Sequence, residues 1–345
     1  MARAYRLIAE KGAADFYKGE IAEAILKTSK RLGGTLTAED LSAFAPEWVK
    51  PISSDYRGWR IFELPPNGQG MAALEMLNIM ETAPAAPAGA SAASEWHKRI
   101  EAMKLAYSDL RRYDADPRFS PVPVEGLLSK TYARKRAALI DPKKANCKVE
   151  AGQPMSGETT YLTVVDREGN IASWIQSISA LFGSGITCDD MGFILHNRGS
   201  GFTLTAGHPN VLAPGKRPFH TIIPAFMEKG DLHIGFGIMG GPIQPLEHAQ
   251  FVSNLVDYGM NIQQALESPR FGKSSAAGCE VFVEARLPQT TVQQLRDQGH
   301  RVSVHREYTQ EMGRGQAILH SSKTGMNYAA SDPRADGSAI PEPRP

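Results

Sequence analysis

Residues Thr159–Ser177 read TTYLTVVDREGNIASWIQS. Two runs rich in threonine, valine, isoleucine and aromatic residues, Thr160–Asp166 and Ile171–Ser179, flank Arg167-Glu168-Gly169. Such runs are typical of β-strands, and a glycine at the end of a three-residue connection suits a hairpin loop. This stretch therefore predicts an antiparallel β-hairpin.

The loop length of this hairpin decides which residues face each other. If Asp166 pairs with Asn170, the register carries Thr159 opposite Ser177, with their Cβ atoms about 5 Å apart on one face. A two-residue loop would shift the register by one and turn that face over. Taken alone, Thr159 and Ser177 are ordinary strand residues, so their meaning depends on the motifs around them.

Helices and strands follow one another without a regular βαβ rhythm, which predicts an α+β fold. Helical patterns precede the hairpin, a capping-box motif (Thr37–Asp40) opens one of them, and Pro84–Ala93 reads as a linker. The segment Gly68-Gln69-Gly70 is interpreted as a turn and helix cap. The predicted helices are Tyr17–Arg31, Thr37–Phe44, Gly70–Glu81, Glu95–Arg112, Ser129–Ile140, Leu246–Tyr258, Ile262–Glu267 and Thr290–Gln298; Asp114–Gly157 is otherwise irregular. The predicted strands besides the hairpin are Arg57–Leu64, Leu232–Ile238, Glu280–Ala285, Arg301–His305 and Gln316–His320.

Composition favours a small-molecule partner. The 345 residues include 38 basic and 37 acidic residues, a net charge of +1, so neither nucleic acid nor a membrane surface is expected. The sequence as written contains no signal peptide or 18-residue apolar run, which predicts a cytoplasmic protein, or a periplasmic one if the natural N-terminus is longer. The sequence leaves open whether the protein forms a homo-oligomer.

Cysteines and histidines give no cofactor signal. Cys147, Cys188 and Cys279 are odd in number and far apart, so a disulfide is not expected and Cys188 is interpreted as a small buried side chain. The nine histidines show no metal-ligand spacing, and we predict neither a metal nor another cofactor.

Several motifs lie around the hairpin in one order. They are DFYKGEIAEAI (Asp15–Ile25), GGTLTAEDL (Gly33–Leu41), PISSDYRGWRIFELPPNGQG (Pro51–Gly70), LFGSGI (Leu181–Ile186), PGKRP (Pro214–Pro218), MGGP (Met239–Pro242) and SDPRADG (Ser331–Gly337). Together with TTYLTVVDREGN, they resemble the γ-glutamyltranspeptidases over nearly the whole chain. Each motif alone is weak, but their shared order makes the resemblance specific. Within SDPRADG, the segment Asp332–Asp336 is interpreted as an ion-paired terminal turn.

The resemblance implies a four-layer αββα sandwich, the fold of N-terminal-nucleophile hydrolases. It divides the chain into residues 1–158, similar to the family's large subunit, and residues 159–345, similar to its small catalytic subunit. The two halves would form one intertwined domain. Cleavage between Glu158 and Thr159 would separate them covalently, and both fragments would stay associated.

The resemblance also implies roles for individual residues. Thr159 corresponds to the nucleophile, whose freed α-amine acts as general base, and Ser177 to a hydroxyl that hydrogen-bonds it. Gly240 and Gly241 correspond to the glycine pair that forms the oxyanion hole. The predicted substrate-binding residues are Ser179, Arg198, His220 and Thr221.

Two departures from the family concern the substrate. Ser200 and Gly201 stand where γ-glutamyl enzymes carry an acidic segment that binds the α-amine, so this anchor is absent and Arg198 instead brings positive charge. His220-Thr221 replace a serine pair that holds the substrate carboxylate. These segments look more like the family's oxamate amidohydrolases and glutaryl-cephalosporin acylases. We also find no counterpart of the long region that precedes residue 1 in family precursors, which supplies strands of the sandwich and a substrate-binding arginine.

The sequence leaves three functions open. The first is a self-cleaving amidohydrolase or acyltransferase that acts on γ-glutamyl or other small acyl amides; an oxamate or glutaryl amide hydrolase without transpeptidation is its variant. The second is an uncleaved, inactive fragment that only binds a partner. The third, a cysteine- or metal-dependent hydrolase, is disfavoured because its motifs are missing.

Overall fold

The computed structural model describes residues 1–149, 158–273 and 275–341, without the side chain of Glu158. Residues 150–157, the end of the segment expected to be irregular, lie outside the described residues. The chain forms two compact units: unit 1 comprises Met1–Val49 and Ile178–Arg198, and unit 2 comprises Lys50–Ser177 and Gly199–Pro345. Residues from both sides of the 158–159 bond contribute to each unit.

Unit 1 is a small helical unit. Its apolar core includes Leu7, Ile21 and Ile25 from the helices together with Cys188 and Met191 from the later segment. The helices are α1 (Ala2–Lys11), α2 (Ala13–Lys18), α3 (Glu20–Arg31) and α4 (Ala38–Ser42). The capping box expected at the start of α4 is present, and a predicted helix over 17–31 is observed as α2 and α3 with a break at Gly19. Cys188 lies in the core, as its interpretation as a small buried side chain requires.

Unit 2 contains a six-stranded antiparallel sheet in the order β1-β2-β5-β6-β10-β11. Its strands are β1 (Ile52–Tyr56), β2 (Trp59–Glu63), β5 (Ala225–Lys229), β6 (Leu232–Met239), β10 (Arg314–Ser321) and β11 (Met326–Ser331). Strand β6 directs Ile234, Phe236 and Ile238 into the main core, where each is fully buried. Sequence patterns predict β2, β6 and β10 of this sheet, whereas β1, β5 and β11 are not among the predicted strands.

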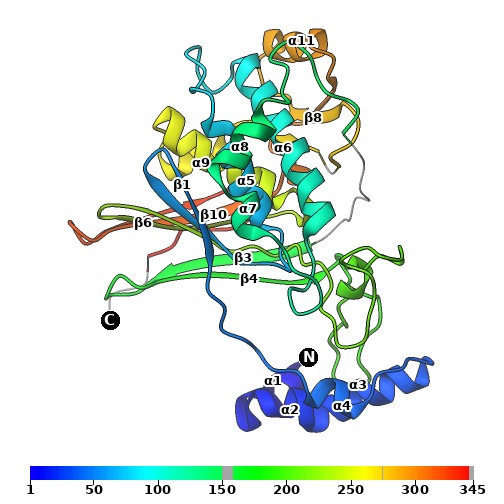
Figure 1. Cartoon of the computed structure of the whole chain (residues 1–345). Coiled ribbons are helices and arrows are strands. Elements are labelled where there is room, and N and C mark those ends of the chain that lie inside the picture. Colours follow the sequence, from blue (N-terminus) through cyan, green and yellow to red (C-terminus); the bar gives the residue numbers. More distant parts are fainter. Residues whose placement is uncertain (150–157, 274, 342–345) are drawn as a thin grey trace. The chain divides into compact units, whose positions relative to one another are not determined.

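Helices cover one face of this sheet, and the β-hairpin formed by β3 (Glu158–Val165) and β4 (Ile171–Ser179) lies along its other face (Figure 1). Helix α5 (Gly70–Glu81) is buried almost all round because it packs between the sheet, α6 (Ala93–Tyr113) and α9 (Gln244–Tyr258). The remaining helices are α7 (Val124–Leu127), α8 (Lys130–Ala137), α10 (Ile262–Glu267) and α11 (Gln289–Asp297), with 3-10 turns η1 (Arg198–Gly201), η2 (Gly241–Ile243) and η3 (Gln310–Met312). A smaller sheet contains β7 (Phe271–Gly272), β8 (Glu280–Glu284) and β9 (Arg301–His305).

The hairpin loop has the three residues that the sequence predicts. Asp166 N–H donates to Asn170 C=O at 3.0 Å, and Gly169 takes a positive φ of 86°. The odd-numbered residues of both strands are the more buried ones, so Thr159 and Ser177 face the six-stranded sheet. The direct pairing of Thr159 with Ser177 stays a prediction of this register.

Two glycines in β6 allow the hairpin to approach the sheet closely. A Cβ atom at Gly237 would lie 2.4 Å from the Tyr161 ring, and one at Gly235 would lie 2.7 Å from Ile171 Cγ2. The Tyr161 hydroxyl lies 2.8 Å from Ser173 Oγ, which donates to Ala225 C=O. The strand bearing Thr159 is therefore fixed to the sheet by packing and by hydrogen bonds.

One expectation about the cysteines is wrong. Cys147 and Cys279 form a disulfide across 132 residues of sequence, with Cα atoms 4.9 Å apart. The spacing of the cysteines along the chain did not indicate this disulfide. The fold produces the pairing, because it brings the segment after α8 to the start of β8.

The SDPRADG motif forms the ion-paired turn that was expected. Asp332 accepts hydrogen bonds from Arg270 and Arg334, and Arg334 also donates to both carboxylate oxygens of Glu284. All four side chains are buried. Their opposite charges compensate one another where water is excluded.

Candidate active site

Thr159 is the second residue of β3, and it is only 6% exposed. Its side chain shares a face with Tyr161, whose ring occupies the space above Gly237. This packing gives the hydroxyl group a defined position at the end of a sheet strand. Ser177 lies on the same face of β4 and is partly buried.

The hydroxyl of Thr159 is contacted from the start of α9. Gln244 Nε2 lies 3.5 Å from Thr159 Oγ1, at the limit of a hydrogen bond, and Gln244 Oε1 accepts the Ile223 N–H at 3.4 Å. Gln244 is completely buried. Gln244 lies three residues after Gly241 and is the first residue of α9. The contact therefore places Thr159, the predicted nucleophile, beside the helix that follows the predicted oxyanion turn.

Gly240 and Gly241 form that turn: Gly240 follows the end of β6, and Gly241 is the first residue of η2. A Cβ atom at Gly240 would lie 2.9 Å from Ile243 Cγ1 and 3.2 Å from Gly313 Cα, so the position has no room for a side chain. Gly241 has a φ of 61°, in the left-handed region that glycine adopts without steric cost. Both positions thus require glycine for physical reasons.

Gln69 connects this turn to a second predicted segment. Its side-chain Nε2 donates to Gly241 C=O at 2.7 Å and to Thr221 C=O at 2.6 Å, and the residue is completely buried. Gln69 occupies the N-cap position of α5, but its side chain does not cap that helix. The segment thus forms the turn and the helix start that were expected, while the Gln69 side chain joins two loops of the candidate site.

Further bonds fix the same loops. The Tyr107 hydroxyl donates to Pro242 C=O, on the residue after Gly241. His220 N–H donates to Asn67 C=O at 2.8 Å, and His220 Nδ1 lies 2.9 Å from Asn67 Nδ2. The structure therefore brings Thr159, the Gly240–Gly241 turn and the His220–Thr221 segment together in unit 2.

Ser179 and Arg198, the other two predicted substrate-binding residues, belong to unit 1. Both are buried, and Ser179 has a positive φ of 78°, a conformation that is uncommon for serine. Burial lowers the pKa of Arg198. Their roles toward a substrate stay predictions.

A buried polar pair lies behind the Gly240–Gly241 turn. His248, one helical turn after Gln244, accepts the Ile238 N–H at Nε2 and therefore donates from Nδ1 to Glu63 Oε1, 2.8 Å away. Burial lowers the pKa of His248 to about 3 and raises the pKa of Glu63 well above its ordinary value. The neutral ring fixes the end of β6 immediately before the turn.

Sequence reasoning missed Gln69, Gln244 and the Glu63–His248 pair. A glutamine has no characteristic spacing from its partners, and these partners are mostly backbone groups of distant segments. Their position in the sequence could have indicated the two glutamines, because Gln69 and Gln244 each lie at the start of a helix that follows a glycine-containing turn.

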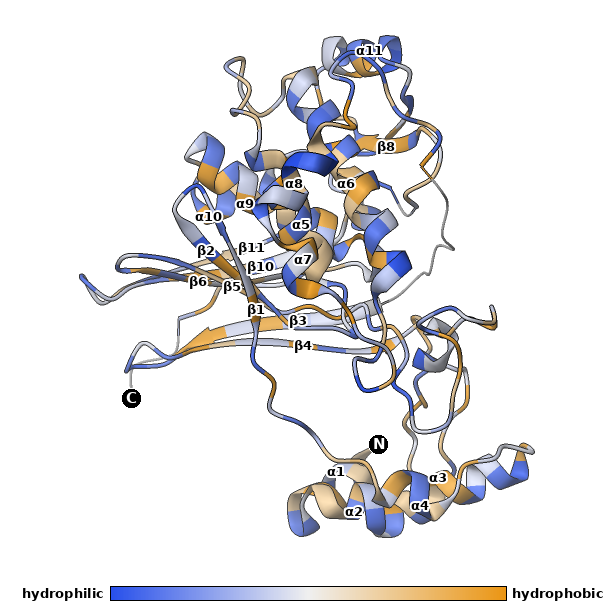
Figure 2. Ribbon diagram, in the orientation of Figure 1, coloured by the Kyte–Doolittle hydropathy of each residue, from blue (hydrophilic) through white to orange (hydrophobic). Residues whose placement is uncertain are grey.

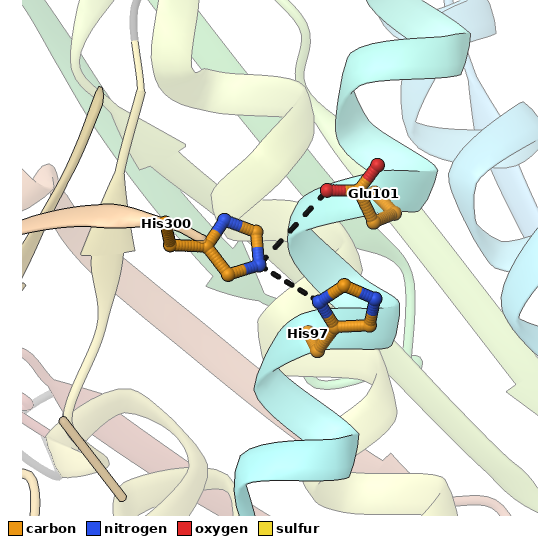
Figure 3. Close-up of side chains that lie close together, drawn as sticks. All are labelled: His97, Glu101 and His300. Atoms are coloured by element: carbon orange, nitrogen blue, oxygen red, sulfur yellow. Dashed lines mark hydrogen bonds and ion pairs between the residues drawn. The ribbon is translucent and has the colours of Figure 1, made fainter. Parts of the chain in front are cut away.

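One group of potential metal ligands is present in the described part of unit 2. One ligand atom each from His97, Glu101 and His300 lies within 4.8 Å of the other two (Figure 3). However, Lys104 Nζ lies 2.6 Å from Glu101 Oε1 and supplies a positive charge at this carboxylate. His97 Nε2 lies 2.8 Å from the Asp141 carbonyl, its hydrogen-bond acceptor. The three side chains thus belong to a hydrogen-bonded and ion-paired network, in which His300 Nδ1 has no hydrogen-bond partner among the described residues.

Among the described residues, none of the helices has the length and apolar composition needed to cross a bilayer.

Comparison with known proteins supports the family that the order of the motifs suggests. The family model described as Gamma-glutamyltranspeptidase matches residues 1–342. The chain is 38% identical to the glutathione hydrolase-like YwrD proenzyme of Bacillus subtilis, over 99% of this chain and 65% of that protein. It is 32% identical to the oxamate amidohydrolase proenzyme of Klebsiella pneumoniae, over 98% of this chain and 64% of that protein.

A solved structure is also similar to this chain over almost its whole length. The crystal structure of cephalosporin acylase from Bacillus halodurans matches with a TM-score of 0.89 and 41% identity, over 98% of this chain and 61% of that one. The chain thus spans slightly less than two thirds of the length of these relatives.

Proposed function

Because this chain belongs to the gamma-glutamyltranspeptidase family, we propose that it is made as a precursor, cuts itself between Glu158 and Thr159, and then hydrolyses a small amide through Thr159. The contact between Gln244 and the Thr159 hydroxyl carries the proposal, because it joins the predicted nucleophile to the helix that follows the glycine turn. The names of two relatives include the word proenzyme, which agrees with processing.

In the precursor, Thr159 Oγ1 attacks the carbonyl carbon of Glu158. The peptide C–N bond breaks, an ester forms at Oγ1, and the α-amine of Thr159 is released. Water then hydrolyses the ester and leaves Thr159 as a new N-terminus. The position of Thr159 as the second residue of β3 suits the reaction, because the hydroxyl is held within the strand while the preceding bond joins it to the strand's first residue.

In the mature protein, the α-amine of Thr159 takes the proton from its own hydroxyl. A free α-amine has a pKa of about 7.7–8.0, which suits a general base near neutral pH. Oγ1 attacks the substrate carbonyl, the leaving amine departs with the proton, and water releases the acyl group. We assign the N–H groups of Gly240 and Gly241 to the oxyanion and the Ser177 hydroxyl to a hydrogen bond with the nucleophile.

The proposed substrate is a small acyl amide that need not carry a γ-glutamyl α-amine. Gly201 supports this choice, because a Cβ atom there would lie 2.7 Å from Phe219 C=O and an aspartate would not fit without movement. Ser200 is uncharged, and we place the positive charge of Arg198 near an anionic acyl group. Hydrolysis of an oxamate or glutaryl type of amide is therefore favoured over transpeptidation.

We further propose the four-layer αββα arrangement for the complete fold. The described residues of unit 2 contain a helical layer, the six-stranded sheet and the hairpin. Strand β3 of the hairpin contains several hydrophobic segments (Figure 2). Leu162, Val164 and Trp174, on the outer face of the hairpin, are about half exposed. A helical layer over this face would complete the sandwich and bury them.

The two fragments are proposed to stay together after cleavage, because residues on both sides of the 158–159 bond contribute to the same core. For the location, the disulfide favours the periplasmic alternative over the cytoplasm, since disulfides persist in oxidising compartments.

Intact mass after purification tests the proposal. Under reducing conditions the wild type should give fragments 1–158 and 159–345, and the second should begin with threonine. Thr159→Ala should remain one chain without amidase activity. Thr160→Ala is the matched control, because Thr160 is an exposed threonine on the other face of β3, and it should be cut normally. A wild-type protein that stays uncut yet hydrolyses amides would show that the mechanism is wrong.

A further inference from the structure

The disulfide and the proposed cleavage point have a specific order along the chain. Cys147 precedes the 158–159 bond and Cys279 follows it, so cleavage opens the loop that the disulfide closes. The two cysteines would then belong to different fragments. We propose that Cys147–Cys279 is a covalent link between the two fragments of the mature protein, and that its reduction makes their association depend on non-covalent contacts alone. This inference rests on the proposed self-cleavage.

The residues around the disulfide form a junction between the two fragments. Ala145 N–H donates to Gln298 C=O at 2.7 Å, beside the disulfide-bonded Cys147. On α6, Lys104 Nζ lies 4.0 Å from Cys279 Sγ and 3.1 Å from Asn146 C=O. The link is therefore embedded in contacts that involve both sides of the cleavage point.

A buried histidine pair crosses the same junction. His97 Nδ1, from the first fragment, lies 2.8 Å from His300 Nε2, from the second (Figure 3). Both residues are almost fully buried, and Glu101 lies 3.9 Å from His300. Burial, assisted by the charge of Lys104, lowers the pKa of His300 to about 3. Separation of the fragments would expose these neutral and charged groups to water and end their mutual hydrogen bonds.

Cleavage changes what the disulfide does to the unfolded state. In the uncut chain it closes a loop and restricts the unfolded ensemble. In the cut protein it keeps two chains in one molecule, so refolding needs no encounter between separate partners. Without it, the stability of the folded pair depends on protein concentration.

The two cysteine residues differ in exposure. Cys147 is exposed, whereas Cys279 is only 1% exposed. A dithiol reductant can therefore attack at the Cys147 side. It supplies two electrons and two protons, yields two cysteine thiols and becomes a disulfide itself.

Denaturing mass analysis of the purified wild type, with and without a dithiol reductant, tests the inference. We expect one species without reductant, with the mass of the full chain plus one water, and two fragments after reduction. Two fragments in both samples would overturn the disulfide link while leaving self-cleavage intact. A single full-length chain in both samples would overturn self-cleavage, and the inference with it.

Variants give a second readout under native conditions. Cut Cys147→Ser protein should unfold at a Tm that rises with protein concentration, whereas the cut wild type should not. Cys147→Ser combined with Thr159→Ala stays one chain and should show no such dependence. Cys188→Ser, which removes the free buried cysteine of unit 1, is the control and should behave as the wild type. A Tm of the cut Cys147→Ser protein that is independent of concentration would contradict the inference.

Discussion

Gln244 places its side-chain nitrogen 3.5 Å from the hydroxyl oxygen of Thr159, and both residues are buried. The same side chain accepts the Ile223 N–H, so one amide connects the start of β3, the start of α9 and the segment after Thr221. This arrangement limits how far the hydroxyl can move. We therefore propose Gln244 as a positioning residue for this chemistry.

Replacement of Gln244 by alanine should slow self-cleavage about 2- to 13-fold, which corresponds to the loss of one hydrogen bond of roughly 0.5–1.5 kcal/mol. The rate is measured by following the fraction of cut chain with time. Gln250→Ala is the matched control, because this buried amide on the same helix also accepts a backbone N–H, from Phe271. Both variants should lose stability, but only Gln244→Ala should cut slowly; equal cutting rates would contradict the assignment.

Gly241→Ala should reduce amidase activity strongly, on the order of 10²–10³-fold, if the strained backbone turns its N–H away from the oxyanion. Gly230→Ala is the control, because Gly230 has the same φ of 61° and no neighbour within 4 Å of an added Cβ. Each variant should lose roughly 1–2 kcal/mol from left-handed backbone strain. Comparable activity in the two purified variants would argue against an oxyanion role for Gly241.

Gly237→Ala tests the packing of the hairpin on the sheet. The added Cβ would lie 2.4 Å from the Tyr161 ring, and such overpacking typically costs about 1–3 kcal/mol. Denaturant unfolding measures the loss. Tyr161→Leu should remove much of the conflict, so the double variant should be less destabilised than the sum of the single changes. Strict additivity would mean that the two positions do not touch.

The stability of the protein should fall as the pH decreases from about 6.5 to 3, in part because of His248. Its pKa is lowered to about 3 in the folded state, so between these values the unfolded chain binds more protons than the folded protein. The contribution reaches about 1.4 kcal/mol per pH unit.

His248→Gln retains an acceptor for Ile238 and a donor for Glu63 but does not titrate. Urea unfolding at several pH values should therefore show a shallower decline for this variant. The same substitution at His305, which is partly exposed, controls for the replacement of a histidine by glutamine as such. A His248→Gln slope equal to that of the wild type would refute the assignment.

A side-by-side hydrolysis panel tests the substrate class. Oxamate or a glutaryl amide should be hydrolysed faster than a γ-glutamyl anilide, because Ser200 and Gly201 offer no carboxylate to an α-ammonium group. Thr159→Ala provides the background rate for each substrate. Strong γ-glutamyl activity that glycylglycine stimulates would refute this preference.

The sequence by itself determined the local features of this protein. Alternating residues and a well-placed glycine predicted the hairpin with its three-residue loop, and helical periodicity predicted α5, α6 and α9. The order of motifs identified the family, which the comparisons confirm. These features were readable because each depends on residues that are neighbours in the chain.

Only the tertiary structure decided which distant groups meet. The Cys147–Cys279 pairing, the Gln69 bridge and the Gln244 contact each join segments that are 85 or more residues apart. Such contacts depend on how sheets and helices pack, and neither a cysteine nor a glutamine carries a local pattern that specifies its partner. The sequence predicted Thr159 as the nucleophile, whereas the fold determined which side chain contacts its hydroxyl group.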